Sequence, residues 1–229
     1  AAAFGSFTTG TAYRVLSSFY SWDKNPFQNQ LGDPMEDGDW KKLYTYIAVM
    51  NVVISQVDNY PNDPEDLRRR VKGEAQFLRA AYYYLLVNMY GKPYVKESAN
   101  TDLGVPLKLS QYVDGGYLKR DVTGKVYEQI VKDLKEAVQN LKGIEQSTIY
   151  RANEMASRIL LSRVYLYMGE WELANAECDS VLNQGVHLRD MNTHAAESSF
   201  IEKSSPEVIF AQGSSVMTYL MGDDRALNY

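Results

Sequence analysis

A loop of aromatic and amide side chains near the N-terminus holds the residue types that could bind a ligand. Between residues 21 and 34 the sequence places Trp22 and Phe27 among Asn25, Asn29 and Asp33. A pyranose ring has an apolar C–H face and a rim of hydroxyls, so it stacks on flat rings and hydrogen-bonds to amides and carboxylates. The composition of this loop therefore predicts a saccharide-binding site. A packing role for Trp22 is the alternative interpretation, because large aromatic side chains also fill protein cores.

Four acidic residues in and beside this loop could supply oxygen ligands for calcium: Asp33, Glu36, Asp37 and Asp39. The EF-hand pattern fails, because Met35 stands at a required oxygen position and Tyr44 stands where a bidentate glutamate is needed. Carboxylates are also favoured at the start of a helix, where the helix dipole attracts negative charge. We interpret them as helix-start carboxylates, with calcium as the alternative, and predict no metal or cofactor.

Catalytic chemistry finds little support in the sequence. It contains no G-x-S-x-G, H-E-x-x-H, phosphate-binding G-x-x-x-x-G-K-[ST] or G-x-G-x-x-G pattern. His187 and His194 stand seven residues apart, but the stretch between them does not read as a helix, so we interpret both as surface residues. Two facing carboxylates would suit a glycosidase, yet 29 acidic residues make such a pair easy to find by chance. The prediction is a protein that is not an enzyme.

Charge and composition restrict the possible partners. The 24 basic and 29 acidic residues leave a net charge of −5, and the longest block of like charge is Arg68–Arg70. This charge distribution lacks the basic patch that nucleic-acid binding requires. The single cysteine, Cys178, excludes an internal disulfide and is predicted to be a small core residue. No apolar run of about 18 residues exists to cross a membrane, and no signal peptide or lipidation cysteine opens the sequence.

The elements that must position the loop are helices. A short helix is expected over about residues 11–21, and a second begins near Asp39 or Trp40, the latter predicted to be a core residue. Asp63 is predicted to cap a third helix, with Pro64 at its first position and Gly91 near its end. The apolar positions of this third helix follow a 4,3 spacing that predicts one buried stripe: Val71, Ala75, Leu78, Tyr82, Leu85 and Met89. Three successive tyrosines, Tyr82 to Tyr84, predict neighbours on more than one side, which makes it a central helix.

A long ordered loop is expected over residues 92–122, followed by a helix over 123–141 and two helices over 153–168 and 171–183. The last two are separated only by Gly169 and Glu170, and they match one tetratricopeptide (TPR) repeat at Leu161, Ser162, Tyr165, Trp171 and Ala174. Trp171 is interpreted as a core residue. Residues 206–211 are expected to form a short strand or extended segment. The predicted fold class is mostly all-α: TPR-like antiparallel helical hairpins in a right-handed superhelix with long loops and minor β pieces.

The central helix carries a family resemblance. Its segment GEAQFLRA, followed by YYYLLVNMYG, spans Gly73 to Gly91 and closely resembles the most recognisable segment of the SusD/RagB family. The segments WKKLY from Trp40, LGVPL from Leu103 and SRVYLYMGEW from Ser162 are similar to family segments in the same order. The resemblance covers roughly residues 38 to 212. It identifies residues 1–229 as the helical N-terminal region of such a protein, with the start of the precursor and the C-terminal portion absent.

The resemblance implies a cell-surface, glycan-binding lipoprotein of the Bacteroidetes outer membrane that performs no chemistry on its ligand. Such proteins cap a SusC-like TonB-dependent transporter, toward which the TPR helices face, and they deliver oligosaccharides to it. Residues 22, 25, 27, 29 and 33 are placed in the ligand site because the family's loop before the helix at Trp40 commonly contributes there. Two alternatives stay open: a TPR-like scaffold for protein–protein contact alone, and a RagB-type receptor that takes up peptides.

Overall fold

A computed structural model of the chain describes residues 18, 21–25, 27–28, 32–34, 38–112, 116, 118–190, 192 and 205–211. In these residues the named elements are α3 (Gly38–Gln56), a short 3₁₀ helix η1 (Val57–Asn59), α4 (Glu65–Tyr90), α5 (Thr123–Leu141), α6 (Glu154–Met168) and α7 (Trp171–Leu182). The only strand-like features of the described residues are two isolated bridges, Gln28 to Pro34 and Leu103 to Val122. The predicted all-α class is therefore confirmed.

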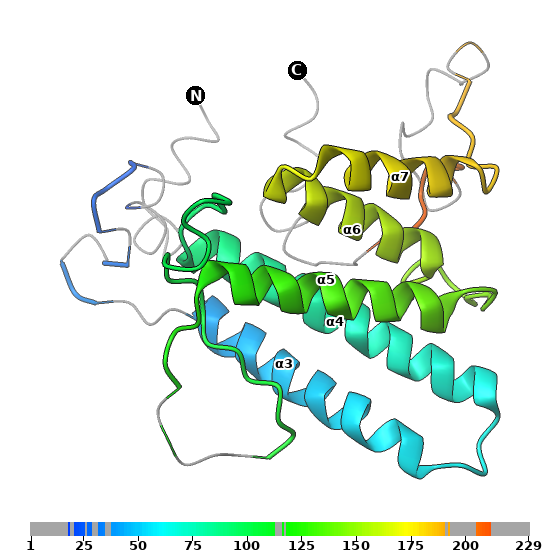
Figure 1. The fold of residues 1–229 in the computed structure, drawn as a ribbon, viewed down its shortest axis with the longest axis horizontal. Helices are drawn as coiled ribbons and strands as arrows, with labels where there is room; N and C mark the ends of the chain where they lie inside the picture. The colour runs from blue at the N-terminus through cyan, green and yellow to red at the C-terminus, as the bar shows by residue number, and fades with distance from the viewer. Residues whose placement is uncertain are drawn as a thin grey trace, which may run out of the picture. The chain divides into compact units, whose positions relative to one another are not determined.

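The chain divides into two compact units. One contains residues 1–42 and 213–229, and the other contains residues 43–212. Within the second unit the helices pack in sequence order, α4 on α5, α5 on α6 and α6 on α7 (Figure 1). The part of α3 in this unit contacts α4 through side chains, such as the Tyr46 and Tyr82 rings, whose centroids lie 5.4 Å apart.

Helix α5 follows its sequence pattern closely. It begins at Thr123 and ends at Leu141, as the spacing predicts. The apolar positions of its stripe are buried: Val126, Ile130, Leu134, Ala137 and Leu141. Because α5 is covered by α4 on one side and α6 on the other, it lies in the middle of the described helical layer.

Helix α4 is central, as predicted, but its buried face is not the predicted stripe. Leu85 and Met89 are 46% and 53% exposed, whereas the neighbouring Leu86 and Val87 are at most 1% exposed. The buried face is displaced by one position from the prediction. Leu78, Tyr82 and Leu85 of the predicted stripe are not buried, whereas Ala75 is. The residues that follow the four stripe positions are all buried: Gln76, Arg79, Tyr83 and Leu86. One residue is about 100° of helix rotation. The stripe prediction failed because two polar residues, Gln76 and Arg79, lie on the side that packs against α5.

Gly73 allows α4 and α5 to approach closely. A Cβ atom on Gly73 would lie 2.7 Å from Leu141 Cγ and 3.0 Å from Asn140 Cβ. Real Cβ atoms do not approach carbon this closely, so a larger residue would force the two helices apart. The glycine in the family-like segment is therefore a packing requirement of the α4–α5 contact.

The α6–α7 hairpin forms as the TPR-like pattern predicts. Asn153 caps α6 by accepting a hydrogen bond from Ala156 N at 2.8 Å, and Gly169 ends it in the left-handed region with φ 75°. Four of the five repeat positions, Leu161, Ser162, Tyr165 and Ala174, are buried.

Two residues of α7 contradict the sequence interpretation. Trp171 was expected in the core but is 61% exposed, and Cys178 is exposed as well, with its sulfur 3.0 Å from Ser162 Oγ. In the described part of the chain α7 packs mainly on α6. A helix with one neighbour leaves most of its circumference open, so its apolar periodicity overstates its burial.

The structure differs from several further sequence predictions, and one predicted helix lies mostly outside the described residues. The N-cap of α4 is Pro64, without a side-chain cap bond, and the helix begins at Glu65 where Asp63 had been expected as the cap. Residues 205–211 contain a turn and a bend and form no named strand. Trp40 is half-buried, which is less than a core position requires. Of the helix expected over residues 11–21, only Ser18 is described as helical.

Candidate functional site

The predicted saccharide loop exposes its aromatic rings. Trp22 is 92% exposed and Phe27 is 36% exposed, while Asn25 and Asp33 also lie at the surface. Asn29 falls outside the described residues. The loop thus exposes an indole, an amide and a carboxylate, the kinds of group that bind the apolar face and the hydroxyls of a sugar. Within the described residues no packing partner covers most of the Trp22 side chain.

The backbone of this loop folds back on itself. Ser18 Oγ donates to Gln28 O at 2.7 Å, Asp23 N donates to Ser18 O at 2.9 Å, and Gln28 bridges to Pro34. Trp22 has φ 56°, a left-handed conformation that costs an L-residue about 1–2 kcal/mol. The loop therefore holds Trp22 in a conformation that its own backbone preference does not favour.

A buried ion pair joins the helices of the larger unit. Arg79 Nε and Nη2 donate to the two carboxylate oxygens of Asp133 at 2.8 and 2.6 Å. Arg79 Nη1 also donates to Asn51 Oδ1 at 2.9 Å, and Gln129 Nε2 donates to Asp133 Oδ1 at 2.8 Å. Burial raises the pKa of the Asp133 carboxyl, and the Arg79 guanidinium opposes that shift. This network ties α3, α4 and α5 together.

Sequence reasoning missed this network. The available signal was a charged residue on the inner side of each of two adjacent helices, Arg79 on α4 and Asp133 on α5. The cost of burying either charge is offset only when the two meet.

The long loop between α4 and α5 is fixed to the helices by side-chain hydrogen bonds. The Tyr83 hydroxyl donates to Lys108 O at 2.7 Å and accepts from Lys108 N at 2.8 Å. Asn51 Nδ2 donates to the same carbonyl at 2.7 Å, and the Tyr44 hydroxyl donates to Pro106 O at 2.8 Å. Burial raises the pKa of both tyrosines. The loop was predicted to be long and ordered. Its described part is held in place by these hydrogen bonds to α3 and α4.

A second exposed aromatic surface lies at the α6–α7 turn. The side chains of Tyr167 and Trp171 are 54% and 61% exposed. The Tyr167 ring centroid lies 5.5 Å from the Tyr84 ring centroid on α4. Lys96, in the long loop, pairs with Glu170 of the turn at 2.8 Å. The prediction did not find this surface, because the TPR pattern led Trp171 to be read as a core residue.

The described residues contain no cluster suited to a metal ion and no helix suited to cross a membrane. They hold no group of three or more His, Cys, Asp and Glu side chains that could bind a metal ion. Glu36, Asp37 and His194 lie outside that part of the chain, so the calcium and histidine interpretations stay untested. None of the described helices combines the length and the apolar character that a membrane crossing needs.

Curated relatives of the chain are SusD-like proteins. It is 25% identical over 150 residues to a SusD-like protein of Formosa agariphila, covering 65% of this chain and 26% of that protein. It is 29% identical over 135 residues to the starch-binding protein SusD of Bacteroides thetaiotaomicron, covering 57% and 21%. The chain thus spans about a quarter of the length of these relatives.

Solved structures share the fold. A SusD superfamily protein from Bacteroides thetaiotaomicron superposes with a TM-score of 0.60 and 29% identity, covering 66% of this chain and 33% of that one. A laminarin-binding SusD-like protein superposes with a TM-score of 0.55 and 27% identity, covering 69% and 32%. The family model described as "Starch-binding associating with outer membrane" matches residues 5–166, which include both the exposed Trp22 loop and the α4–α5 core. This chain therefore belongs to the SusD-like family.

Proposed function

We propose that this chain is part of a glycan-binding protein of the bacterial outer surface. It holds oligosaccharides without altering them and delivers them to a SusC-like TonB-dependent transporter, to which a lipid-anchored, outward-facing protein would have direct access. The observation that carries the proposal is the family match over residues 5–166, a family described by starch binding and association with the outer membrane.

The exposed loop supplies the chemistry for this role. Trp22 offers a flat, accessible indole, and Asn25 and Asp33 offer hydrogen-bonding groups on the same closed loop. We assign Trp22, Asn25, Phe27, Asn29 and Asp33 to the ligand contact. Stacking of a sugar ring on tryptophan stabilises binding without placing an acid or base at the glycosidic bond, which suits a receptor with no chemistry of its own.

Affinity gel electrophoresis tests the proposal. The chain is run through native gels containing starch, laminarin or another neutral polysaccharide, and its retardation is compared with that of Trp22→Ala. We expect retardation by at least one polysaccharide, and a reduction of about tenfold in affinity when the indole is removed, because one aromatic contact contributes about 1–1.5 kcal/mol.

Trp171→Ala is the matched control, since it removes a second exposed tryptophan from a different surface. Equal losses in both variants would reject the Trp22 loop as the site. No retardation by any polysaccharide, repeated with the full-length protein, would reject glycan binding itself.

Protein–protein contact alone is the second candidate function. The exposed Tyr167 and Trp171 favour it, because tyrosine and tryptophan are enriched at interface hot spots. Co-purification with an outer-membrane transporter, abolished by Trp171→Ala and without any saccharide binding, would select this function over the first. A peptide that competes for the Trp22 loop would instead indicate a RagB-type uptake receptor.

A further inference from the structure

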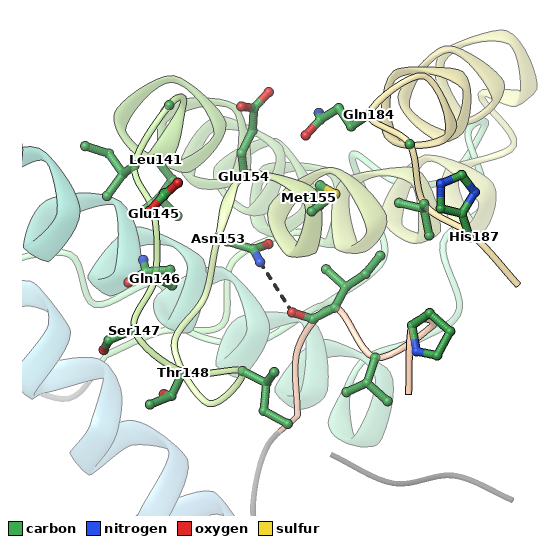
Figure 2. A pocket seen from close by; sticks show the side chains of 18 residues that line it. Leu141, Glu145, Gln146, Ser147, Thr148, Asn153, Glu154, Met155, Gln184 and His187 are labelled. Atoms are coloured by element: carbon green, nitrogen blue, oxygen red, sulfur yellow. Dashed lines mark hydrogen bonds between the residues drawn. The ribbon is translucent and has the colours of Figure 1, made fainter. Parts of the chain in front are cut away.

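A cavity of about 910 Å³ at the α5–α6 connection does not select one class of ligand. Its walls are three separated segments: the connection together with the start of α6, the residues after α7, and residues 206–209. The side chains labelled in Figure 2 include carboxylates, hydroxyls, amides and an imidazole. Those of Glu145, Ser147, Thr148 and His187 are exposed, so water can satisfy them. The lining offers donors and acceptors alike and favours no particular ligand.

The Trp22 loop, in contrast, is closed by a buried side chain whose role the ligand contacts do not explain. Ser18 is helical, is only 5% exposed and stands four residues before Trp22. The Ser18 carbonyl accepts a hydrogen bond from Asp23 N at 2.9 Å, and the Ser18 hydroxyl donates to Gln28 O at 2.7 Å. Ser18 thus binds two different parts of the loop, one through its backbone and one through its side chain.

The backbone bond of Ser18 identifies the turn at Trp22 as the C-terminal end of a helix. In the Schellman pattern the amide of residue i+5 donates to the carbonyl of residue i, and residue i+4 is left-handed. Asp23 donates to Ser18 in this way, and Trp22 has φ 56°. Glycine normally occupies the left-handed position, because a Cβ atom is disfavoured there. The turn therefore holds an indole where the backbone prefers no side chain.

The hydroxyl bond of Ser18 joins this helix end to the second half of the loop. The carbonyl of Gln28 accepts the bond, and Gln28 also bridges to Pro34. Phe27 and Asp33 directly precede these two bridge partners in the sequence. One hydroxyl therefore links the turn that carries the indole to the part of the loop that carries two further proposed ligand contacts.

We infer that Ser18 is a positioning residue for ligand binding by this loop: its hydroxyl holds the Trp22 turn and the Gln28–Pro34 bridge in one arrangement. A left-handed tryptophan persists only where surrounding contacts over-determine its conformation. Loss of the hydroxyl bond therefore lets the Trp22 backbone relax, and the indole is no longer presented in a fixed orientation. This inference rests on the proposed glycan contact at Trp22.

The rotational freedom of the Trp22 indole tests the inference without any ligand. In a chain carrying Trp40→Phe and Trp171→Phe, Trp22 is the only tryptophan, and its fluorescence anisotropy decay reports its local rotation. We expect Ser18→Ala to enlarge the fast component of this decay, because the turn has lost one of the contacts that hold it. The circular-dichroism spectrum should stay helical, since alanine is a strong helix former.

Polysaccharide retardation in native gels tests the consequence for binding. With a polysaccharide that retards the original chain, we expect Ser18→Ala to bind about fivefold more weakly, the typical contribution of one intramolecular hydrogen bond. Ser55→Ala is the matched control, because it removes a serine hydroxyl bond of the same 2.7 Å length, from α3 to Gln111, in the unit of residues 43–212. The control should change neither the anisotropy decay nor the retardation.

An anisotropy decay that Ser18→Ala leaves unchanged would overturn the inference. Full retardation of Ser18→Ala, together with the loss expected for Trp22→Ala, would overturn it as well, because the indole would then bind without being held. If Trp22→Ala itself keeps full retardation, the glycan contact assigned to the loop fails, and the anisotropy decay alone decides whether Ser18 holds the turn.

Discussion

At the scale of single residues, the ion pair between Arg79 and Asp133 joins α4 to α5 inside the core. Asp133 is fully buried and Arg79 nearly so, and each satisfies the other with two hydrogen bonds. Replacing such a pair with apolar residues can be neutral, but removing one partner leaves a buried charge without compensation. A shifted register between α4 and α5 would leave both charges buried without a partner, so we expect the pair to favour the observed register.

We expect Arg79→Met to lower the free energy of unfolding by about 3–5 kcal/mol at neutral pH, because Asp133 then stays charged and unpaired. The loss should shrink in mild acid: without Arg79 the carboxyl pKa rises further in the folded state, and protonation below that pKa relieves the penalty. Urea unfolding at two pH values measures both effects.

Arg151→Gln serves as the control for this ion pair. Arg151 pairs with Glu74 at 2.7 Å, but its side chain is 44% exposed, so its removal should cost less than about 1 kcal/mol. A restoration of stability in the double variant Arg79→Met, Asp133→Leu would confirm that the uncompensated charge, and not lost packing, causes the defect. Equal destabilisation by Arg79→Met and Arg151→Gln would contradict it.

Buried tyrosine hydroxyls predict an alkaline limit to stability. Burial raises the pKa of Tyr127 from 10.0 to about 12, with the neighbouring Tyr167 adding to the shift and Asn88 opposing it. Between these values the unfolded chain releases the proton and the folded chain keeps it. Stability is therefore lost as pH rises through this window, by on the order of 2 kcal/mol for this residue.

Tyr127→Phe should flatten the fall in unfolding free energy between pH 10 and about 12, since the variant has no hydroxyl to titrate there. The Tyr127 hydroxyl lies 3.5 Å from Asn88 Oδ1, a long contact, so little should be lost at neutral pH. Urea unfolding across the alkaline range measures the slope. Tyr60→Phe, at an exposed site, is the control, and an unchanged slope in Tyr127→Phe would argue against the burial effect.

At the scale of elements, the α4–α5 contact depends on the absence of a side chain at residue 73. Alanine normally stabilises a helix interior by about 1 kcal/mol relative to glycine. We expect Gly73→Ala to lower the free energy of unfolding by about 1–3 kcal/mol instead, because its Cβ would lie 2.7 Å from Leu141 Cγ. Thermal unfolding followed by circular dichroism measures the change.

The control for this contact is Gly38→Ala at the start of α3, where a Cβ meets nothing within 4 Å. That variant should be as stable as the original chain or slightly more stable. If Gly73→Ala proved equally stable, the helices would have to separate at little cost, and the close approach would not be a requirement of the fold.

The helices themselves could be predicted because their periodicity and end signals are local. Asn153 and Gly169 begin and end α6 by interactions within a few residues, and the α5 stripe is apolar throughout. What the pattern could not show was the orientation of α4. Its buried face includes Gln76, whose Nε2 donates to Glu136 Oε2 and whose Oε1 accepts from Asn140 Nδ2 at 2.8 Å. Such burial depends on partners on another helix, about 60 residues away in the sequence, which periodicity in one segment does not report.

The candidate site was predictable to a lesser degree. Residue types led to the prediction that Trp22 stacks on a sugar, which stays a prediction; the structure adds that the side chain is exposed. The cavity at the α5–α6 connection was not predictable, because its walls come from three separated segments brought together by the α5–α6 packing and the contact of residues 205–211 with Ile149 and Phe77.

At the scale of the whole molecule, the fold and the proposed glycan contact belong to different units. The buried ion pair, the tyrosine contacts to the long loop and the helical hairpin all lie within residues 43–212, whereas Trp22 and Asp33 lie within residues 1–42. A chain that begins at Gly38 keeps α3 whole and removes the loop. Stability and ligand binding should therefore be separable by a single truncation.

We expect the chain of residues 38–212 to retain its helical circular-dichroism spectrum and to unfold cooperatively, with a melting temperature within a few degrees of the original, because the described core contacts are all present. Its retardation by polysaccharide should disappear together with Trp22. Loss of folding would mean that residues 1–37 contribute to the core. Folding with full polysaccharide binding would move the glycan site to the exposed Tyr167 and Trp171 surface, where the same aromatic chemistry is available.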